Sequence, residues 1–258
     1  MPWYSDNGLT RLNFIVTGNR QAGCRFLQEL LGKSDKIASH IDLLHENEEV
    51  RKNAHQAYYG NTGKVITHYA SYQISVEQYL NNKVFDNARK NEQIVGIKLN
   101  YPTICNNQLW DYLDQKTRKG DFCVIHIVRN PVACYINHKL KNPIIDEDSL
   151  TLNYDKNKLY IDSNDLIDFV RQHEAARAKI NRFCTDRLVL TYSELLFNLK
   201  QVLEGIFEFL ETPFDPVVIP SDRTYQHREP RSQVLNWAQL KANMPSDVLP
   251  FLLCDELI

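Results

Sequence analysis

The chain has 258 residues, of which 43% are hydrophobic and 24% are charged. This is the composition of a globular protein, and it excludes disordered, collagen-like and coiled-coil chains. The 30 lysines and arginines nearly balance the 32 aspartates and glutamates. We therefore expect no broad basic face for nucleic acid, and any anion site must be local.

The sequence shows no pattern typical of export or membrane insertion. Its start lacks a positively charged stretch followed by an apolar core, and no window approaches the ~18 apolar residues of a membrane span. We expect a soluble, cytoplasmic protein that binds neither nucleic acid nor membrane. The six cysteines form no CxxC pair, so we expect reduced thiols and no metal site.

The first predicted elements are a strand, a loop and a helix. The β-branched and aromatic run at 12–17 predicts a buried strand, and the loop that follows extends from Gly18 to Gly23. Apolar residues at helical spacing predict a helix over Cys24–Leu31, where Gly32 supplies a C-terminal stop.

The rest of the chain alternates between strands and helices after a polar segment, 36–92, whose clearest helix is predicted at 75–89. The later predicted elements are strands at 94–99, 122–129 and 187–192, and helices at 106–117, 164–184, 193–210 and near Trp237. Such alternation is typical of a parallel sheet with crossover helices. Since no repeat or linker divides the chain, we expect one α/β domain over 1–258, with helices flanking a mostly parallel central sheet.

The glycines of the first loop have the spacing of a phosphate-binding loop. Gly18 and Gly23 form G-x-x-x-x-G where a strand leads to a helix, so that backbone N–H groups and the positive helix end converge on an anion. The next residues are Cys24 and Arg25, where a nucleotide triphosphatase has Lys and a magnesium-binding Ser or Thr. This pattern suits transfer of a less charged group, such as sulfuryl. The alternative is a turn that needs glycines only for its backbone angles.

A second candidate anion site follows the strand at 122–129. Arg129 ends this strand, Pro131 lies in the first turn of the next helix, and Asn137 lies two turns along. The segment VIHIVRNPVACYINHK resembles the second signature of the sulfotransferases that use 3′-phosphoadenosine 5′-phosphosulfate (PAPS). That signature is an apolar strand, Arg-Asp-Pro, and a Ser eight residues after the Arg, so Asn130 and Asn137 depart from it.

Other stretches resemble the same family in the same order. GNRQAGCRFLQELL resembles its 5′-phosphosulfate loop, in the Arg-Lys-Gly-Gly-Thr-Arg form of heparan sulfate sulfotransferases. VGIKL resembles a core strand of bacterial carbohydrate sulfotransferases. LTYSELLFNLKQVLEGIFEFLETPFDP resembles the Tyr-Glu-Asp-Leu segment, and REPRSQVLNWAQL resembles the C-terminal loop over the cofactor. The resemblance implies the sulfotransferase fold, which is similar to that of P-loop nucleotide triphosphatases.

The resemblance also implies which residues bind PAPS. The implied residues of the first loop are Arg20, Gln21, Ala22, Gly23, Cys24 and Arg25. Further along, Arg129 and Asn137 would bind the 3′-phosphate and Tyr192 would contact adenine. Arg228 and Arg231 would close over the phosphates.

The catalytic cation of the family's first loop is missing here. A Lys or Arg of that loop stabilises charge on the bridging oxygen in the family, and Gln21 stands at its position. Glutamine brings no positive charge, and charge-assisted hydrogen bonds are about twice as strong as neutral ones. Our hypothesis is that Arg20 or Arg25 supplies the charge.

A base must also take the proton of the acceptor. Asp42 stands where the resemblance to bacterial carbohydrate sulfotransferases implies such a base, and His45 is the next candidate, with His40 and Glu46 as further alternatives. A solvated helix start is the structural alternative for this segment.

Two further segments can be compared with the Lys-Thr-His strand of cytosolic sulfotransferases, which they resemble. His68, in KVITHY, is a reserve candidate for the base. If IKLN occupies that strand instead, Lys98 is directed towards the phosphosulfate and Asn100 takes the place of the His.

These patterns predict a sulfotransferase that moves a sulfuryl group from PAPS to a hydroxyl or amine of a small-molecule acceptor, such as a sugar, lipid precursor or secondary metabolite. The product nucleotide would be 3′-phosphoadenosine 5′-phosphate (PAP), and no metal would be needed. The alternatives are a catalytically degenerate protein that binds PAP or PAPS, and a nucleotide kinase-like phosphotransferase. The sequence is compatible with a homodimer.

Overall fold

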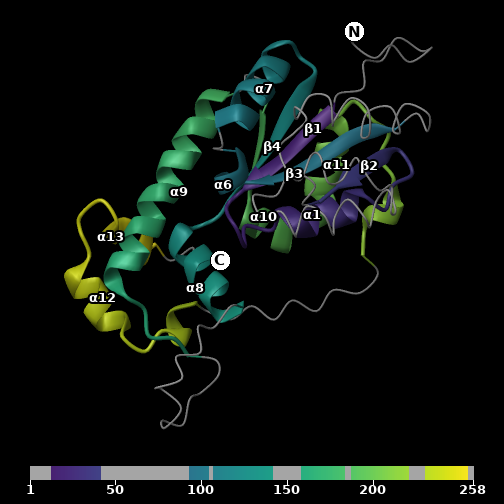
Figure 1. Cartoon of the computed structure of the whole chain (residues 1–258). Helices are drawn as coiled ribbons and strands as arrows, with labels where there is room; N and C mark the ends of the chain where they lie inside the picture. The colour runs from purple at the N-terminus through teal and green to yellow at the C-terminus, as the bar shows by residue number, and fades with distance from the viewer. Residues whose placement is uncertain are drawn as a thin grey trace, which may run out of the picture.

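A computed structural model of the chain is shown in Figure 1, and it describes residues 13–41, 93–104, 107–141, 158–183, 187–220 and 230–254. Within these ranges, parallel strands form one five-stranded sheet in the order β2-β3-β1-β4-β5. The strands are β1 (Asn13–Gly18), β2 (Ile37–His40), β3 (Ile94–Asn100), β4 (Phe122–Val128) and β5 (Arg187–Thr191). This confirms the predicted α/β class with a parallel central sheet.

Helices cover both faces of this sheet. The described helices are α1 (Cys24–Leu31), α6 (Tyr101–Ile104), α7 (Asn107–Arg118), α8 (Pro131–Lys141), α9 (Ser163–Phe183), α10 (Tyr192–Phe197), α11 (Leu199–Phe209), α12 (Trp237–Asn243) and α13 (Leu249–Leu253), with 3-10 turns η3 (Pro216–Val218) and η4 (Pro230–Gln233). In Figure 1, α1, α10 and α11 lie on one side of the sheet, and α7 and α9 lie on the other. The central strands are therefore buried on both faces, as parallel strands usually are.

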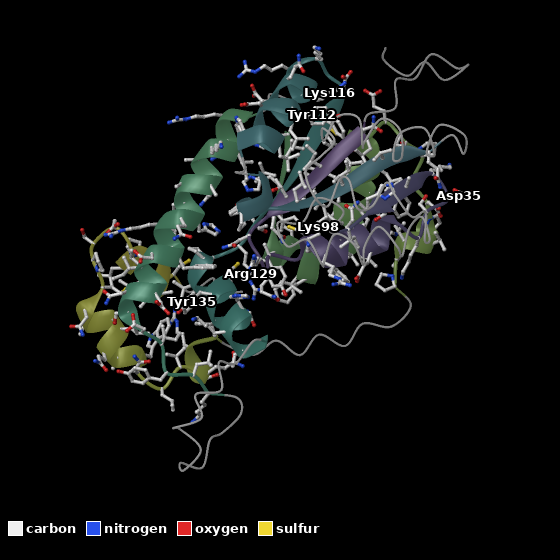
Figure 2. All side chains as sticks on the ribbon, viewed as in Figure 1. Asp35, Lys98, Tyr112, Lys116, Arg129 and Tyr135 are labelled. Carbon is white, nitrogen blue, oxygen red and sulfur yellow. The ribbon has the colours of Figure 1, made fainter. Side chains whose placement is uncertain are left out.

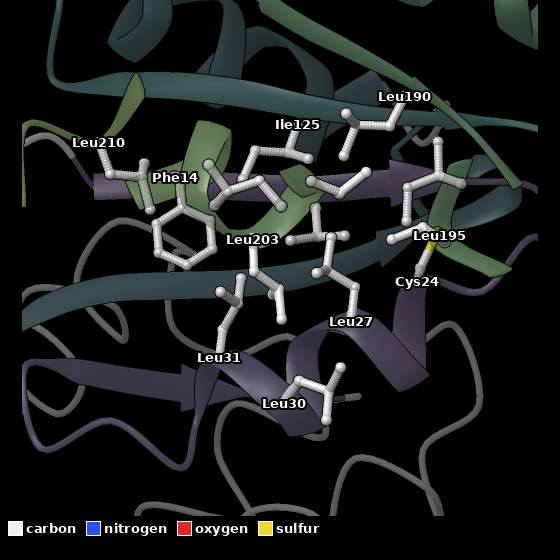
Figure 3. Close-up of a cluster of buried hydrophobic side chains, with 14 of the residues drawn as sticks. Phe14, Cys24, Leu27, Leu30, Leu31, Ile125, Leu190, Leu195, Leu203 and Leu210 are labelled. Carbon is white, nitrogen blue, oxygen red and sulfur yellow. The ribbon is translucent and has the colours of Figure 1, made fainter. Parts of the chain in front are cut away.

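The main hydrophobic core fills the space between the sheet and the helices α1 and α11 (Figure 3). Phe14 and Leu27 are fully buried there, and so is Leu203 on the facing helix. Burial of one such side chain stabilises the fold by about 1.5–3 kcal/mol. Because Phe14 and Val16 alternate with Ile15 along β1, the same strand also buries apolar surface on its opposite face.

A second hydrophobic cluster joins the later helices. It contains Ile136 of α8, Val170 of α9 and Leu240 of α12, all 0–1% exposed. This cluster fixes α8, which carries a predicted anion-binding residue, against the long helix α9. None of the described helices is both long and apolar enough to cross a lipid bilayer.

Several predicted elements have the expected bounds. The helix predicted at 24–31 is α1, and the helices predicted at 106–117 and 164–184 are α7 and α9, with ends shifted by one residue. The helix predicted at 193–210 is divided at Asn198, whose φ of −123° and ψ of 31° are not helical. The helix predicted at 75–89 lies outside the described residues.

Three short elements were not predicted. The strand β2 has only the four residues IASH in a polar segment, where neither an apolar run nor a regular alternation is present. The helices α6 and α13 have four and five residues. Elements this short depend on tertiary packing, because few residues contribute a periodic signal.

Candidate active site

The loop between β1 and α1 is a tight turn in which both motif glycines are required. A Cβ atom added to Gly18 would lie 2.7 Å from the carbonyl oxygen of Ile127 and 2.8 Å from Cys24 Sγ. Gly23 has a φ of 94°, and Gln21 has a φ of 65°. Positive φ angles favour glycine, so the loop holds Gln21 in an uncommon conformation that turns successive backbone amides in new directions.

The same loop forms the N-terminus of α1. Gly23 is the N-cap and offers no side chain to the first turn, whose backbone N–H groups have no intrahelical acceptor and carry partial positive charge. Within the loop, Asn19 accepts the Arg20 amide through Oδ1 at 2.7 Å and the Ala22 amide through its carbonyl at 3.1 Å. This arrangement is suited to an anion, as the sequence predicts.

Arg129 joins the second predicted site to this loop. It follows the last residue of β4, and its Nη1 donates to the carbonyl oxygen of Gln21 at 2.6 Å. Its guanidinium carbon lies 3.9 Å from the centre of the Tyr192 ring. Arg129 Nε is buried without a hydrogen-bond partner in the structure. A buried donor left unpaired costs about 1–3 kcal/mol, so this nitrogen can donate to a group that enters the site.

Tyr192 closes the other side of the loop. Its ring would lie 3.1 Å from a Cβ added to Gly23, so the ring packs directly on the loop backbone. The residue begins α10, where Thr191 and Glu194 form a capping box. The cap fixes where α10 starts and therefore where the Tyr192 ring lies.

The helix α8 carries the polar residues Asn137 and His138. The Asn137 side chain donates to the Ala133 carbonyl at 2.9 Å, and the residue is partly buried. Burial lowers the pKa of His138, and the positive charges of Arg20 and Lys139 lower it further. The charge of Arg20 thus acts on a side chain of α8.

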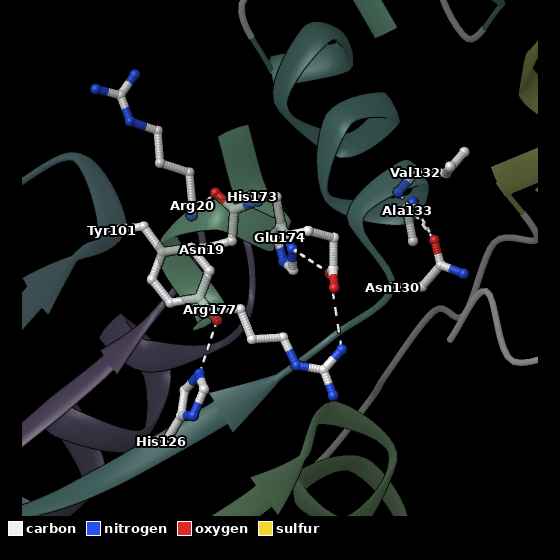
Figure 4. A network of polar contacts seen from close by, with 10 residues as sticks. All are labelled: Asn19, Arg20, Tyr101, His126, Asn130, Val132, Ala133, His173, Glu174 and Arg177. Atoms are coloured by element: carbon white, nitrogen blue, oxygen red, sulfur yellow. Dashed lines mark hydrogen bonds and ion pairs between the residues drawn. The ribbon is translucent and has the colours of Figure 1, made fainter. Parts of the chain in front are cut away.

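Asn130 replaces the aspartate of the family signature without loss of a helix cap. Its Oδ1 accepts from the backbone amides of Val132 at 2.8 Å and Ala133 at 3.3 Å (Figure 4). Its Nδ2 donates to the Phe251 carbonyl at 2.9 Å, which ties α8 to α13. An amide performs both contacts, whereas a carboxylate lacks the donor.

Lys98 and Asn100 lie in β3 beside the loop, and Figure 2 labels Lys98 in the same part of the molecule as Arg129. In the sheet register, Lys98 is opposite Val16 and Asn100 is opposite Gly18, and both are 8% exposed. Burial raises the pKa of Cys24 to about 12, and the charge of Lys98 opposes this shift. The buried Lys98 side chain thus acts electrostatically on the first residue of α1.

The other predicted arginines have different surroundings. Arg25 forms an ion pair with Glu29 at 2.8 Å along the exposed side of α1, with side chains 69% and 52% exposed. Arg231 donates to the Cys254 carbonyl at 2.9 Å and lies 5.9 Å from the centre of the Trp237 ring. The predicted site residues Asp42, His45, His68 and Arg228 lie outside the described residues.

A buried polar network lies behind the loop (Figure 4). Tyr101 Oη is 2.7 Å from His126 Nε2, and the ring of His173 meets that of Tyr101 edge-on with centroids 5.1 Å apart. His126 is 1% exposed. Its Nε2 has a partner, but its Nδ1 is buried without one.

No family model and no curated protein matches the sequence. Among solved structures, the sulfotransferase domain of the Synechococcus PCC 7002 olefin synthase is similar with a TM-score of 0.55 and 13% identity, over 98% of this chain and 97% of that one. A sulfotransferase from Alicyclobacillus acidocaldarius superimposes with a TM-score of 0.47 and 19% identity, over 94% of this chain and 93% of that one.

The first of these likenesses extends over the whole length of both chains. At 13% identity it concerns the arrangement of strands and helices rather than individual residues. That arrangement agrees with what the glycine loop, Arg129 and the order of the family-like segments led us to expect. The chain has the fold of the sulfotransferase family.

Proposed function

We propose that the protein transfers a sulfuryl group from PAPS to a hydroxyl or amine of a small-molecule acceptor. One observation carries the proposal: Arg129 donates a hydrogen bond to the Gln21 carbonyl at 2.6 Å. This contact makes the glycine loop and the end of β4 one continuous anion site. A site of this extent suits a nucleotide with phosphates at both its 5′ and 3′ positions.

The residues of this site fit the donor. The loop amides and the N-terminus of α1 would hold the 5′-phosphosulfate. Arg129, whose Nε is buried and unpaired, would hold the 3′-phosphate together with Asn137. Tyr192, packed on Gly23, would contact adenine next to the loop. When bound, PAPS supplies the sulfuryl group.

Lys98 is the best candidate for the positive charge that the family's first loop supplies and that Gln21 does not provide. The Lys98 side chain is nearly buried near Cys24 at the start of α1, where its charge is little screened by solvent. Arg25, in contrast, is paired with Glu29 on an exposed helix face. A buried, preorganised charge stabilises a leaving oxygen more than an exposed one. Arg20 remains a second candidate because it belongs to the loop itself.

The acceptor side of the site would include Asn100. Asn100 lies opposite Gly18 at the end of β3, and its carboxamide can donate to or accept from an acceptor group. The base that takes the acceptor proton remains a prediction, with Asp42 first, His45 second and His68 in reserve.

Binding without transfer is the second candidate function, and specific contacts favour it. Gln21 carries no charge, and Asn137 donates to a carbonyl of its own helix. A protein that keeps the donor site but has lost catalysis would show these same features. The distinction therefore rests on whether sulfate moves.

The experiment that tests the proposal measures binding and transfer separately. Calorimetric titration with PAP, beside ATP with magnesium, should show binding of PAP alone. Transfer from ³⁵S-labelled PAPS to a panel of hydroxyl and amine acceptors should then be detected. Binding of ATP with magnesium alone would favour a kinase-like protein. Binding of PAP with no transfer to any acceptor would favour the second candidate.

Variants assign the roles within this assay. Arg129→Ala should weaken PAP binding, whereas Lys98→Met should retain binding and lose transfer. Tyr112→Phe in α7 removes one hydroxyl far from the loop (Figure 2) and should change neither. If Lys98→Met transferred sulfate at the rate of the unmodified protein, the role given to Lys98 would be wrong.

A further inference from the structure

The carboxyl ends of β3 and β4 are joined by a side-chain contact that the sheet itself does not provide. These strands are not neighbours, because β1 lies between them. Their ladders end at the same point, where Asn100 and Ile127 both face Gly18. The next residue after β3 is Tyr101, whose hydroxyl lies 2.7 Å from Nε2 of His126. The contact therefore spans the end of β1.

This contact lies on the face of the sheet opposite to α1. The neighbours of His126 in β4 are Ile125 and Ile127, which pack in the core with α1, so His126 is directed to the other face. In the register it is opposite Thr17, the residue before Gly18. The contact is thus directly behind the first residue of the anion-binding loop.

The two partners are neutral and shielded from water. Tyr101 is 3% exposed and His126 is 1% exposed. Burial raises the pKa of the Tyr101 hydroxyl and lowers the pKa of His126 to about 4, with Arg187, Arg177 and His173 adding to the second shift. At neutral pH the phenol can therefore donate to Nε2 of an uncharged imidazole. A net contribution of about 1 kcal/mol is typical of such a bond.

The helix α9 holds Tyr101 in place from the outside. The His173 ring meets the Tyr101 ring edge-on at 5.1 Å. His173 Nδ1 lies 3.0 Å from Glu174 Oε1, which is 3.7 Å from Arg177 Nη1. Tyr101 is thus restrained at its ring by α9 and at its hydroxyl by β4. Both restraints act on the point where the chain leaves β3.

We propose that Tyr101, held by His126, is a positioning residue that fixes Asn100 beside the anion-binding loop. Asn100 immediately precedes Tyr101 and is the last residue of β3, so its place depends on how the chain leaves the strand. The inference rests on the proposed function for what Asn100 does, namely contact the acceptor. The positioning itself is a property of the fold and is measurable without turnover.

The test compares Tyr101→Phe with Tyr112→Phe, which removes a hydroxyl from α7 instead. In Tyr101→Phe, kcat should fall about tenfold, which corresponds to about 1.4 kcal/mol. The dissociation constant for PAP should stay within twofold, because Arg129 and the loop are unchanged. Tyr112→Phe should leave both values unchanged. An unchanged kcat in Tyr101→Phe would overturn the proposal.

A double-variant cycle separates positioning from general loss of stability. If Tyr101 acts through Asn100, adding Tyr101→Phe to Asn100→Ala should lower kcat no further. If Tyr101→Phe lowered kcat by the same factor in the unmodified protein and in Asn100→Ala, the result would contradict the proposal. Should Tyr101→Phe fail to fold, His126→Leu takes its place in the cycle, since it removes the other partner of the bond.

Hydrogen exchange gives an answer that does not depend on transfer. Peptides that cover 98–101 should exchange about tenfold faster in Tyr101→Phe than in Tyr112→Phe, as expected for a local opening. Unchanged exchange there would overturn the proposal. If the unmodified protein moved no sulfate, the proposed function would fail, while this exchange result would still decide whether Tyr101 fixes the end of β3.

Discussion

The two strand ends that form the candidate site offer an anion two different kinds of group. At the end of β1 the loop from Gly18 to Gly23 offers backbone amides and a helix N-terminus. At the end of β4 the group on offer is the side chain of Arg129, held between the Gln21 carbonyl and the Tyr192 ring. The first site is made by backbone shape, and the second by charge.

This difference has consequences for what each site tolerates. A backbone site depends on the absence of side-chain atoms at its glycines, so that even one methyl group is excluded. A side-chain site depends on one charged group, and the surrounding residues can keep their positions when that group is removed. We therefore expect changes at the first site to act on folding and binding together, and changes at the second to act mainly on binding.

The largest effect is expected from Gly18→Ala. The added Cβ would lie 2.7 Å from the Ile127 carbonyl oxygen, which belongs to a central strand and cannot move freely. The free energy of unfolding should fall by about 2–3 kcal/mol, and PAP binding should be lost. Urea unfolding and calorimetry measure the two effects.

The matched control is Gly205→Ala in α11, where no atom lies within 4 Å of the added Cβ. This variant should be more stable by about 0.5–1 kcal/mol, because alanine is the better helix former. If Gly18→Ala had the stability and PAP affinity of the unmodified protein, the loop would not depend on its backbone shape.

The next effect is expected from Arg129→Ala, which tests the charged site. Loss of a charge-assisted contact to phosphate, typically worth about 1.5–3 kcal/mol, should weaken PAP binding about 10- to 100-fold. Arg171→Ala in α9 removes the same charge from a pair with Asp247 in which both side chains are 54% exposed. It should bind PAP within twofold of the unmodified protein. Equal weakening in both variants would show only an effect of net charge.

The sequence was sufficient to predict the loop between β1 and α1 and the place of Arg129 directly after β4. Glycine spacing and the apolar runs of β1 and β4 are local patterns, and each is readable within a dozen residues. The pair of Arg25 and Glu29 also has a local signal, because residues four apart lie on the same helix face. That spacing would have indicated that Arg25 has a partner on the surface.

Other contacts of the site depend on the order of the strands. The bond between Tyr101 and His126 joins residues 25 positions apart, and it requires that β1 lie between β3 and β4. The bond from Arg231 in η4 to the carbonyl of Cys254, directly after α13, likewise joins residues 23 positions apart. No periodicity within one segment reports on such pairs, so they appear only when the sheet is assembled.

Acid should lower the free energy of unfolding through His126 in β4. This effect should be smaller than those of Gly18→Ala and Arg129→Ala. The pKa of His126 is lowered from 6.5 to about 4 by burial, so the unfolded chain binds a proton more readily than the folded one. Its contribution to stability is complete above pH 6.5 and is lost as the pH falls towards 4. Between pH 7 and pH 5 the loss should be about 1–2 kcal/mol.

Urea unfolding at the two pH values measures this loss, and His126→Leu isolates it. His40 in β2 is buried with a pKa near 4 as well, so the variant should retain part of the acid sensitivity. The free energy of unfolding should nevertheless depend less steeply on pH in His126→Leu than in the unmodified protein. An unchanged slope in His126→Leu would mean that other groups account for the acid sensitivity.

The smallest effect is expected from Thr191→Ala, which acts on the charged site through the Tyr192 ring. The Thr191 side chain accepts the Glu194 amide at 3.2 Å, and Glu194 Oε2 accepts the Thr191 amide at 2.6 Å. Loss of this cap should cost about 1 kcal/mol and lower Tm by about 2–4 °C. Ser193→Ala, in the first turn of the same helix, is the matched control and should change Tm less.

The effect of Thr191→Ala on PAP should be weaker than that of Arg129→Ala. The guanidinium and its bond to the Gln21 carbonyl remain, and only the ring that packs against them loses its restraint. A loss of affinity as large as that of Arg129→Ala would mean that the ring, rather than the charge, dominates the β4 site. The contrast between a backbone site and a charged site would then give way to one between a backbone site and a stacked aromatic site.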